Sequence, residues 1–334
     1  MSKKATAQFW DTAHRYLGHQ LKVIRQVSSH TIDSYRDCLN SFIDYLERVE
    51  NISRKKISFH DFGKETIKRY QTWMITEQGL APKTCNLRLT AIRSFLEYAA
   101  QEYLWLMPVY TDACTIAGVK TPNHAIEYFE PDEMTALLAA PSGTSRTDRR
   151  NQMMLIFLYD TAARVAEARQ VKVSDLHLDA GVPYVTLLGK GRKYRNIPLM
   201  EKTVLHLKRY LKDFHGSDPK TDLPLFYAKA HGLLHELSSD TFEKMIKRYA
   251  EQCREGGYPM PDRVHCHMIR KTRAMDLYRE GVPLPHIQQL LGHENISTTS
   301  GFYAFATLDV LENAMEAVNP DNGVISWSDA YILE

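Results

Sequence analysis

The sequence lacks an excess of either charge sign, paired cysteines and long apolar runs, and each absence excludes a class of protein. Its 42 Lys and Arg residues nearly balance 40 Asp and Glu residues, so the strongly basic total typical of a nucleic-acid-binding domain is missing. The five cysteines are odd in number and form no C-x-x-C pair, which argues against a disulfide framework. No apolar run reaches the roughly 18 residues of a membrane span, and the N-terminus has no apolar signal segment. We therefore expect a soluble, cytoplasmic protein with no membrane partner.

The first part of the chain has the periodicity of helices. At roughly 150 residues per domain, 334 residues predict about two domains. Apolar residues recur every three or four positions over 29–50, and similar patterns over 64–78 and 83–103 predict two more helices. With a short helix before residue 28 these segments predict a four-helix bundle, without strands before residue 120. Its Tyr and Phe residues over 29–103 are interpreted as core.

The second part mixes helices with one strand pattern. Residues 107–128 contain two prolines and a glycine without sustained periodicity, and 117–128 is interpreted as an interdomain linker. The β pattern lies in 182–199, as two strands around the turn 189–193. Helices are expected near 131–140, 147–162, 164–171, 200–214, 238–254, 267–281, 284–291 and 307–318.

The near-neutral total hides an uneven distribution of charge. Residues 1–123 carry 17 Lys and Arg against 12 Asp and Glu, a net charge of +5. Residues 304–334 carry six acidic residues and no Lys or Arg, which leaves 124–303 at +3. Both main parts of the chain are thus mildly basic. Because affinity for DNA depends on where cations lie rather than on their sum, the total of +2 does not exclude a DNA-binding protein.

Four short segments carry the most specific signal. They are TAARVAE at 161–167, GKGRK at 189–193, HMIR at 267–270, and LGH at 291–293 with Tyr303 ten residues after the histidine. A lone H-x-x-R is common by chance, but these elements occur together in one order. In this order and spacing the chain resembles the tyrosine recombinase (phage integrase) family, which includes Xer-type and Cre-type recombinases. The resemblance covers nearly the whole chain.

The resemblance implies a fold that is mainly α with a small β-sheet. A helical, SAM-like core-binding domain would span 1–116, followed by the linker 117–128 and an α+β catalytic domain over 129–303. Together the two domains would form a C-shaped clamp on DNA. Residues 304–334 would form a C-terminal helix and an acidic tail that docks on a neighbouring protomer.

The resemblance also implies a catalytic set of Arg164, Lys190, His267, Arg270, His293 and Tyr303, with Glu167 supporting the first arginine. Tyr303 would attack the scissile phosphate and leave a 3′-phosphotyrosyl bond and a free 5′-hydroxyl. The arginines and histidines would hold the phosphate, and Lys190 would protonate the leaving oxygen. The chemistry agrees, because arginine binds phosphate bidentately and an alkoxide leaving group needs an acid. No metal or other cofactor is required by this set.

Further cations are expected to contact the DNA backbone. The candidates are Arg36, Lys83, Arg88, Arg93, Arg192, Lys193, Lys271 and Arg273. The partners implied by the resemblance are double-stranded DNA with inverted half-sites and further copies of the chain in a homotetramer, with accessory DNA-bending proteins left open. A recombinase of this type would associate with the nucleoid and serve integration, excision or resolution of a mobile element or replicon through a Holliday junction.

The sequence departs from the family pattern in three places and leaves two other functions open. Ala162 stands where the family usually has glycine, Lys271 stands where histidine is frequent, and the spacing from His293 to Tyr303 is one residue longer than in Xer-like members, as in other integrases. A type IB topoisomerase-like DNA relaxing enzyme would share the chemistry without a tetramer, and a catalytically silent DNA-binding protein would share the fold. The triplet 265–267 lacks a second ligand pair for zinc, and the glycines at 189–191 lack the P-loop signature.

Overall fold

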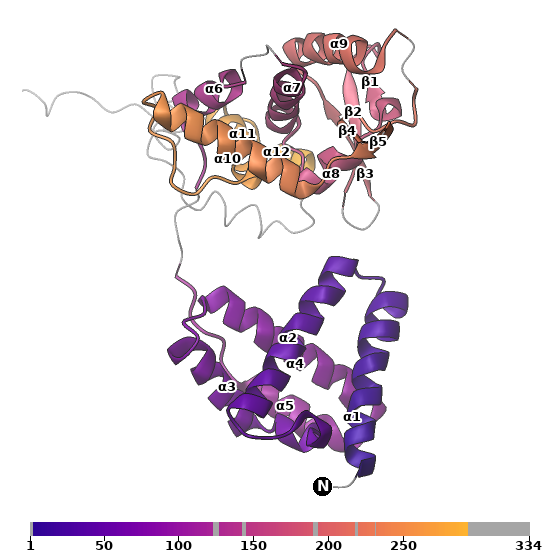
Figure 1. Cartoon of the computed structure of the whole chain (residues 1–334), viewed down its shortest axis with the longest axis vertical. Helices are drawn as coiled ribbons and strands as arrows, with labels where there is room; N and C mark the ends of the chain where they lie inside the picture. Colours follow the sequence, from indigo (N-terminus) through magenta and orange to yellow (C-terminus); the bar gives the residue numbers. More distant parts are fainter. Residues whose placement is uncertain are drawn as a thin grey trace, which may run out of the picture. The chain divides into compact units, whose positions relative to one another are not determined.

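The computed structural model describes residues 3–122, 127–141, 145–189, 193–217, 220–230 and 232–292. The chain divides into two compact units, Met1–His124 and Ala125–Glu334 (Figure 1). Helices dominate the described residues, and the strands form one three-stranded and one two-stranded sheet. The predicted fold class, mainly α with a small sheet, is confirmed.

Among its described residues the first unit contains helices joined by loops, without strands. They are α1 (Lys3–Arg15), the π-helix η1 (Tyr16–Ile24), α2 (Ser29–Arg48), the 3₁₀ turns η2 (Arg54–Lys56) and η3 (Phe59–Phe62), α3 (Lys64–Thr76), α4 (Pro82–Glu102), the 3₁₀ turn η4 (Leu104–Leu106) and α5 (Met107–Thr115). Local sequence explains several ends. The Ser28 hydroxyl accepts a hydrogen bond from the backbone N–H of Thr31 at the start of α2. Pro82 occupies the first turn of α4, where its missing N–H costs no hydrogen bond.

Aromatic side chains form the core of this unit. Phe42 packs edge-to-face on Phe62 and Tyr70, with ring centroids 4.8 and 5.0 Å apart. Phe9 from α1 approaches Phe95 of α4 in the same manner at 5.8 Å. All five rings are buried. The interpretation of the aromatic stripes as core is therefore confirmed, and edge-to-face pairs add a modest stabilisation beyond burial.

Two features of the first unit differ from the predicted four-helix bundle. The N-terminal helix is longer than expected, because α1 continues into η1. Residues 107–115, for which the sequence shows no sustained periodicity, form α5. Arg93 of α4 donates to the carbonyl oxygens of Ala113 and Ile116 at the end of α5. Because these bonds come from a distant side chain, the local sequence pattern does not reveal the helix.

The second unit surrounds a small antiparallel sheet with helices. Its elements are α6 (Pro131–Ala139), α7 (Arg146–Thr161), α8 (Val165–Gln170), η5 (Val173–Asp175), β1 (Leu176–His177), β2 (Tyr184–Leu188), β3 (Tyr194–Pro198), α9 (Glu201–His215), β4 (Tyr227–Ala230), β5 (Leu233–Glu236), α10 (Ser239–Glu255), α11 (Cys266–Arg279) and α12 (Leu284–Leu291). The strands β1, β2 and β3 pair in that order, with Val185 opposite Ile197 and Leu187 opposite Arg195. Alternate residues of β2 point into the core, where Phe157 of α7 and Ile269 of α11 are fully buried.

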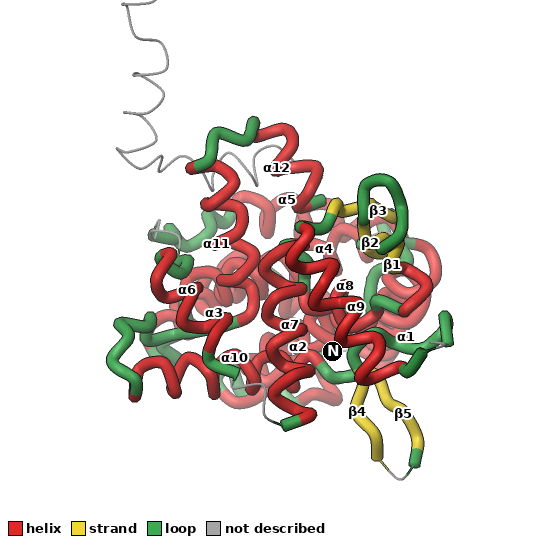
Figure 2. Tube along the Cα trace, turned by 90° about the horizontal axis from the view of Figure 1, so that it is seen from above, coloured by secondary structure: helices red, strands yellow, loops and turns green. Residues whose placement is uncertain are grey.

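The β4–β5 hairpin was not predicted. Its strands have four residues each, and every residue of β5 is exposed, so no apolar alternation marks them. Gly232 supplies the positive φ of 79° that the connecting turn requires. Figure 2 shows the two strands extending from the helices of their unit. The two-residue strand β1 was also missed.

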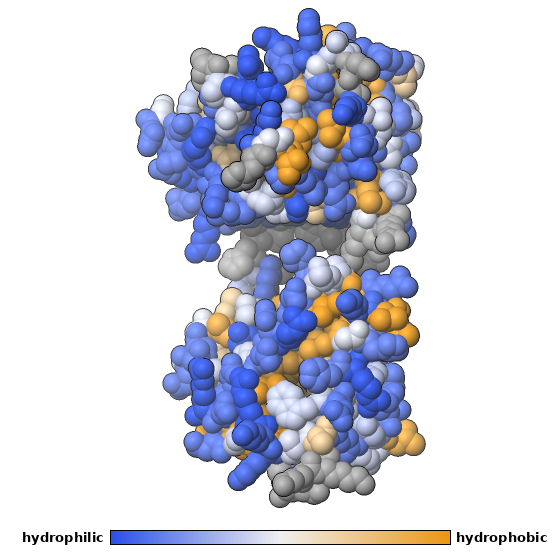
Figure 3. Space-filling model, turned by 45° about the vertical axis from the view of Figure 1, so that its right-hand side comes forward, coloured by the Kyte–Doolittle hydropathy of each residue, from blue (hydrophilic) through white to orange (hydrophobic). Residues whose placement is uncertain are grey.

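The visible surfaces of both units are largely hydrophilic. In Figure 3 polar side chains cover most of the face shown, and apolar side chains gather in small patches. Among the described helices, none combines the length and the apolar character that a bilayer span needs.

Candidate active site

The site begins at a sharp bend between α7 and α8. Ala162 ends α7 in the left-handed region, with φ 49° and ψ 29°, and is fully buried. This conformation costs a residue with a Cβ about 1–2 kcal/mol. The carbonyl oxygen of Ala162 accepts a hydrogen bond of 2.7 Å from Nη1 of Arg270. The departure from glycine at this position is thus accommodated as a strained alanine that the tertiary structure holds in place.

Glu167 lies at the centre of the site. Its carboxylate is 4% exposed and accepts hydrogen bonds from the backbone N–H of Arg164 at 2.8 Å and from Nη1 of Arg164 at 2.9 Å. Nη1 of Arg270 lies 4.0 Å from the second carboxylate oxygen. Burial alone would raise the pKa of Glu167, but the hydrogen bonds and charges of Arg195 and Arg164 lower it to about 2. Glu167 is therefore ionised at neutral pH and orients two predicted phosphate ligands.

Arg195 of β3 is a member of this site that the sequence analysis missed. Its Nη1 and Nη2 atoms donate to the two carboxylate oxygens of Glu167 at 2.8 and 2.7 Å. Its Nε donates to the carbonyl oxygen of Leu290 at 3.0 Å. The side chain is 13% exposed. Its position on the inward-facing side of β3, opposite Leu187, is a signal that could have pointed to a buried arginine in need of a partner.

Helix α11 carries two further predicted residues of the site, His267 and Arg270. Its N-cap residue His265 makes no capping bond, and the carboxylate of Glu243 from α10 instead accepts from the N–H of Cys266, with both oxygens at 3.3 Å. Arg270, 3% exposed, also donates from Nη2 to the carbonyl oxygen of Leu291. His267 lies three residues before Arg270, so both side chains occupy one side of the helix.

The surroundings of His267 hold its imidazole neutral. Shielding from water lowers the pKa of His267 to about 4, together with the positive charges of Arg270, Lys271, His265 and Arg164. The residue itself is accessible to solvent. At neutral pH this side chain can therefore accept a proton from a group that binds beside it.

The cluster has more positive than negative charge. Three guanidinium groups, from Arg164, Arg195 and Arg270, surround the single carboxylate of Glu167. Arg164 is the most accessible of the three, with 35% of its side chain exposed. An anionic group that binds here meets donors whose orientation is already fixed. Such a cluster is suited to hold a phosphate group and to stabilise negative charge that develops on it.

Four of the predicted site residues fall outside the described part of the chain: Lys190, Arg192, His293 and Tyr303. The structure brings Arg164, Glu167, His267 and Arg270 together. Lys271 adds its charge to the surroundings of His267, and Lys193 is exposed where β3 is about to begin.

The residues predicted to contact the DNA backbone fall into two groups. Arg36 and Lys83 are exposed, and Arg36 pairs with Asp33 on its own helix. Arg88 is half-buried beside Tyr70.

The other group consists of arginines bonded inside their own unit. Arg93 is bonded to the end of α5, and Arg273 stacks over Tyr159 at 5.3 Å and lies 3.9 Å from Asp160. Both side chains are partly accessible, and their contact with DNA stays a prediction.

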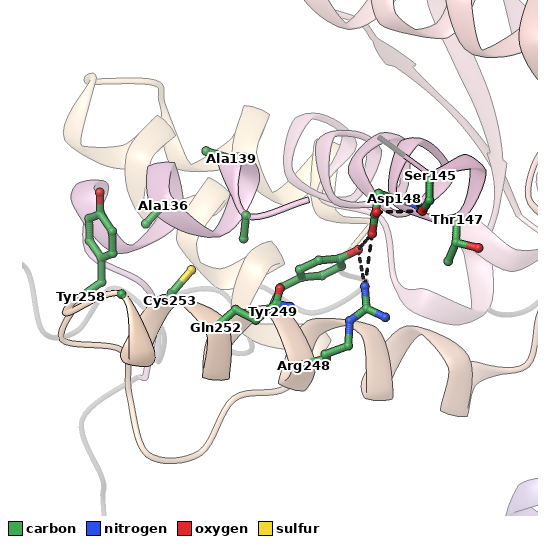
Figure 4. A pocket seen from close by; sticks show the side chains of 12 residues that line it. Ala136, Ala139, Ser145, Thr147, Asp148, Arg248, Tyr249, Gln252, Cys253 and Tyr258 are labelled. Carbon is green, nitrogen blue, oxygen red and sulfur yellow. Dashed lines mark hydrogen bonds and ion pairs between the residues drawn. The ribbon is translucent and has the colours of Figure 1, made fainter. Parts of the chain in front are cut away.

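A cavity of about 850 Å³ lies elsewhere in the second unit, between α6, α10 and the start of α7 (Figure 4). On its wall the Tyr249 hydroxyl donates to Asp148 at 2.9 Å, and Arg248 pairs with Asp148 at 3.3 Å. No predicted site residue of the described chain lines this cavity. In the same described residues, no group of three or more His, Cys, Asp or Glu side chains is arranged to hold a metal ion.

Comparisons with known proteins identify the family of the chain. Residues 127–307 match the model of the phage integrase family, and residues 14–103 match that of the phage integrase N-terminal SAM-like domain. The chain is 33% identical over 285 residues to the tyrosine recombinase XerD of Halalkalibacterium halodurans, covering 84% of this chain and 89% of that protein. It is 31% identical over 301 residues to a protein of Sinorhizobium fredii named as an integrase/recombinase, y4rC, covering 90% and 88%.

Solved structures share the fold. The Tn1549 transposon integrase in complex with a circular intermediate DNA aligns with a TM-score of 0.70 at 17% identity, covering 94% of this chain and 99% of that one. The XerH site-specific recombinase bound to its palindromic difH substrate aligns with a TM-score of 0.66 at 20% identity, covering 88% and 82%. At these identities the likeness concerns the fold.

Proposed function

The chain belongs to the phage integrase family of tyrosine recombinases, and on this premise we propose that Tyr303 is the nucleophile of a DNA strand transfer at the Glu167 cluster. The protein is a site-specific DNA recombinase, an enzyme whose partner is DNA. The observation that supports the proposed residues is the convergence of Arg164 and Arg270, separated by more than a hundred positions in sequence, on one buried carboxylate. Such a pair of guanidinium groups can hold the two non-bridging oxygens of one phosphate.

The proposed step exchanges one phosphate ester for another. The phenolic oxygen of Tyr303 forms a bond to phosphorus while the bond from phosphorus to the 5′-oxygen breaks. The phenolic proton passes to His267, which is neutral at pH 7 and becomes a stronger base beside the bound phosphate anion. Lys190 gives a proton to the departing 5′-oxygen, and His293 donates a hydrogen bond to the phosphate. Because the 3′-phosphotyrosyl bond is itself a phosphate ester, it keeps the energy of the broken bond. The reverse step therefore rejoins the strand without a nucleotide cofactor such as ATP.

Arg164 and Arg270, held by Glu167, form a phosphate clamp, which lowers the barrier chiefly through its charge. The phosphate gains negative charge as the five-coordinate transition state forms, and donors that are already oriented need no reorganisation at that moment. Glu167 holds Arg164 and Arg270 in this orientation. Arg36, Lys83, Arg88, Arg192, Lys193 and Lys271 would contact backbone phosphates and position the duplex, and they would carry no sequence information of their own.

The proposed assembly follows from the resemblance to the family. Four copies would bind two DNA segments at inverted half-sites and exchange strands through a Holliday junction, in the service of a mobile element or replicon. Residues 307–318 would form a helix whose apolar residues dock on a neighbouring protomer. The core-binding domain would end at residue 116, the linker at 128 and the catalytic domain at 303. Accessory DNA-bending proteins and association with the nucleoid complete this proposal.

A nicked suicide duplex tests the nucleophile. The duplex carries the inverted repeat that flanks the coding sequence, with a nick that lets the cleaved end diffuse away. The native chain is expected to form an SDS-stable protein–DNA adduct, which Tyr303→Phe abolishes while DNA binding persists. A native chain that binds this duplex without an adduct would contradict the nucleophile and favour a catalytically silent binder. Relaxation of a supercoiled plasmid without the repeat, at the rate seen with it, would favour the topoisomerase-like activity.

Deleting 305–334 tests the tail. We expect the shortened chain to bind a single half-site normally and to lose assembly into larger complexes, as measured by light scattering on DNA. Unchanged tetramer formation would refute docking by this segment.

A further inference from the structure

Arg195 connects three separate segments of the active site. It reaches from β3 to the carboxylate of Glu167 in α8 and to the backbone of Leu290 at the end of α12. Three of its five N–H groups are engaged in these bonds. The planar guanidinium matches the two carboxylate oxygens, a geometry that lysine cannot reproduce with its single nitrogen.

Two glycines lie directly against this side chain. A Cβ added to Gly189 would come within 3.2 Å of Nη1 of Arg195, and one added to Gly292 would meet its Cδ and Nη1 at 3.2 Å. Gly189 immediately precedes Lys190, and Gly292 immediately precedes His293. Arg195 therefore contacts the residues that directly precede the proposed general acid, Lys190, and the proposed phosphate ligand, His293.

The remaining contacts connect Arg195 to the phosphate clamp. The carboxylate that it holds is the one that binds Arg164 at 2.9 Å and approaches Arg270 at 4.0 Å. Arg270 in turn donates to the carbonyl oxygen of Leu291, the residue after the one bonded by Arg195. A shift of Arg195 would thus move the clamp and the end of α12 together.

We propose that Arg195 is a positioning residue for strand transfer. It fixes the Arg164–Glu167–Arg270 clamp relative to Gly189 and Gly292, the residues that precede Lys190 and His293. Arg195 acts through these groups and does not itself contact the phosphate. The proposal rests on the proposed function, because Lys190 and His293 matter only if strand transfer occurs there.

The first experiment measures single-turnover cleavage of the nicked suicide duplex at saturating protein. Arg195→Gln is expected to lower the cleavage rate about 100-fold, as a misplacement of catalytic groups near 1 Å would, while DNA affinity changes less than about threefold. Arg195→Lys should recover part of the rate, because it keeps the charge but not the fork. The matched control is Arg254→Gln, since Arg254 also bonds a carboxylate and two carbonyl groups, on α10 and outside the clamp. It should cleave within about twofold of the native rate.

The second experiment separates positioning from simple loss of structure. A duplex with sulfur in place of the 5′-bridging oxygen has a leaving group that needs no proton, so it bypasses Lys190. The deficit of Arg195→Gln should become several-fold smaller on this duplex than on the ordinary one. In addition, Glu167→Gln combined with Arg195→Gln should be no slower than the worse single variant, because both changes break one unit.

The outcomes keep the two proposals apart. If the native chain forms no adduct, the proposed function fails. If the native chain cleaves and Arg195→Gln matches its rate, or shows equal deficits on both duplexes, or adds fully to Glu167→Gln, then the positioning role is overturned. Should circular dichroism show that Arg195→Gln does not fold, Gly189→Ala decides, because its methyl presses on Nη1 of Arg195 and on the carbonyl oxygen of Lys193 and leaves every charge in place. Cleavage by Gly189→Ala at the native rate would then overturn the role.

Discussion

The buried charge of Glu167 allows a quantitative prediction of stability. The pKa of this group lies at about 2 in the folded chain instead of 4.5. One pKa unit corresponds to about 1.4 kcal/mol, so ionised Glu167 contributes roughly 3 kcal/mol to the free energy of unfolding at pH 7. The folded pKa is depressed. The contribution is therefore complete above the unfolded pKa and disappears as the pH falls through the folded value.

Urea unfolding of the complete chain measures this contribution. Far-UV circular dichroism follows both units, and fluorescence mainly follows the first, because Trp10, Trp73 and Trp105 belong to it. Glu167→Gln should lower the stability of the second unit by about 3 kcal/mol at pH 7, a midpoint shift of roughly 1.5 M if the m-value is about 2 kcal/mol/M.

The pH dependence and a surface control make the prediction refutable. The difference between native chain and Glu167→Gln should persist above about pH 5 and shrink steadily between pH 4.5 and 2. The control Glu251→Gln removes an exposed partner of Arg254 and should cost less than about 1 kcal/mol. A loss below about 1 kcal/mol for Glu167→Gln at pH 7, or a difference that is independent of pH, would refute the reasoning.

Three further predictions concern the bend, α5 and the histidine. Ala162→Gly relieves about 1–2 kcal/mol of left-handed strain but gives up a buried methyl and gains unfolded-state entropy, so stability should change by less than about 1 kcal/mol, whereas Ala162→Val should lose about 2 kcal/mol or more by thermal unfolding. Arg93→Ala should destabilise the first unit by about 2 kcal/mol, measured by tryptophan fluorescence, and should leave DNA affinity nearly unchanged; a weaker complex at unchanged stability would identify Arg93 as a DNA contact instead. If His267 accepts the proton and its pKa in the free enzyme is about 4, the second-order rate constant of cleavage should show no loss from protonation of His267 between pH 8 and 5.5. An inflection near pH 6.5 that vanishes in His267→Asn would contradict this.

Agreement between sequence and structure is best where one local signal is enough. The helix over 29–48 follows from an apolar stripe with a serine cap, and the hairpin over 184–198 follows from two strands around a glycine turn. Helix α5 and the β4–β5 hairpin were missed because their local signals are weak. The bonds from Arg93 to the end of α5, made across the tertiary structure, are absent from any sequence window.

The sequence by itself indicated the family of this protein, through a joint set of arginines, histidines, a lysine and a tyrosine in a fixed order. That is possible because phosphate transfer restricts which side chains can serve. Only the tertiary structure revealed what holds Arg164 and Arg270. Arg195 carried no motif signal, and its contacts with Glu167 of α8 and Leu290 of α12 exist only in the folded chain. A buried ion pair depends on geometry across distant segments, and residue spacing along the chain does not encode that geometry.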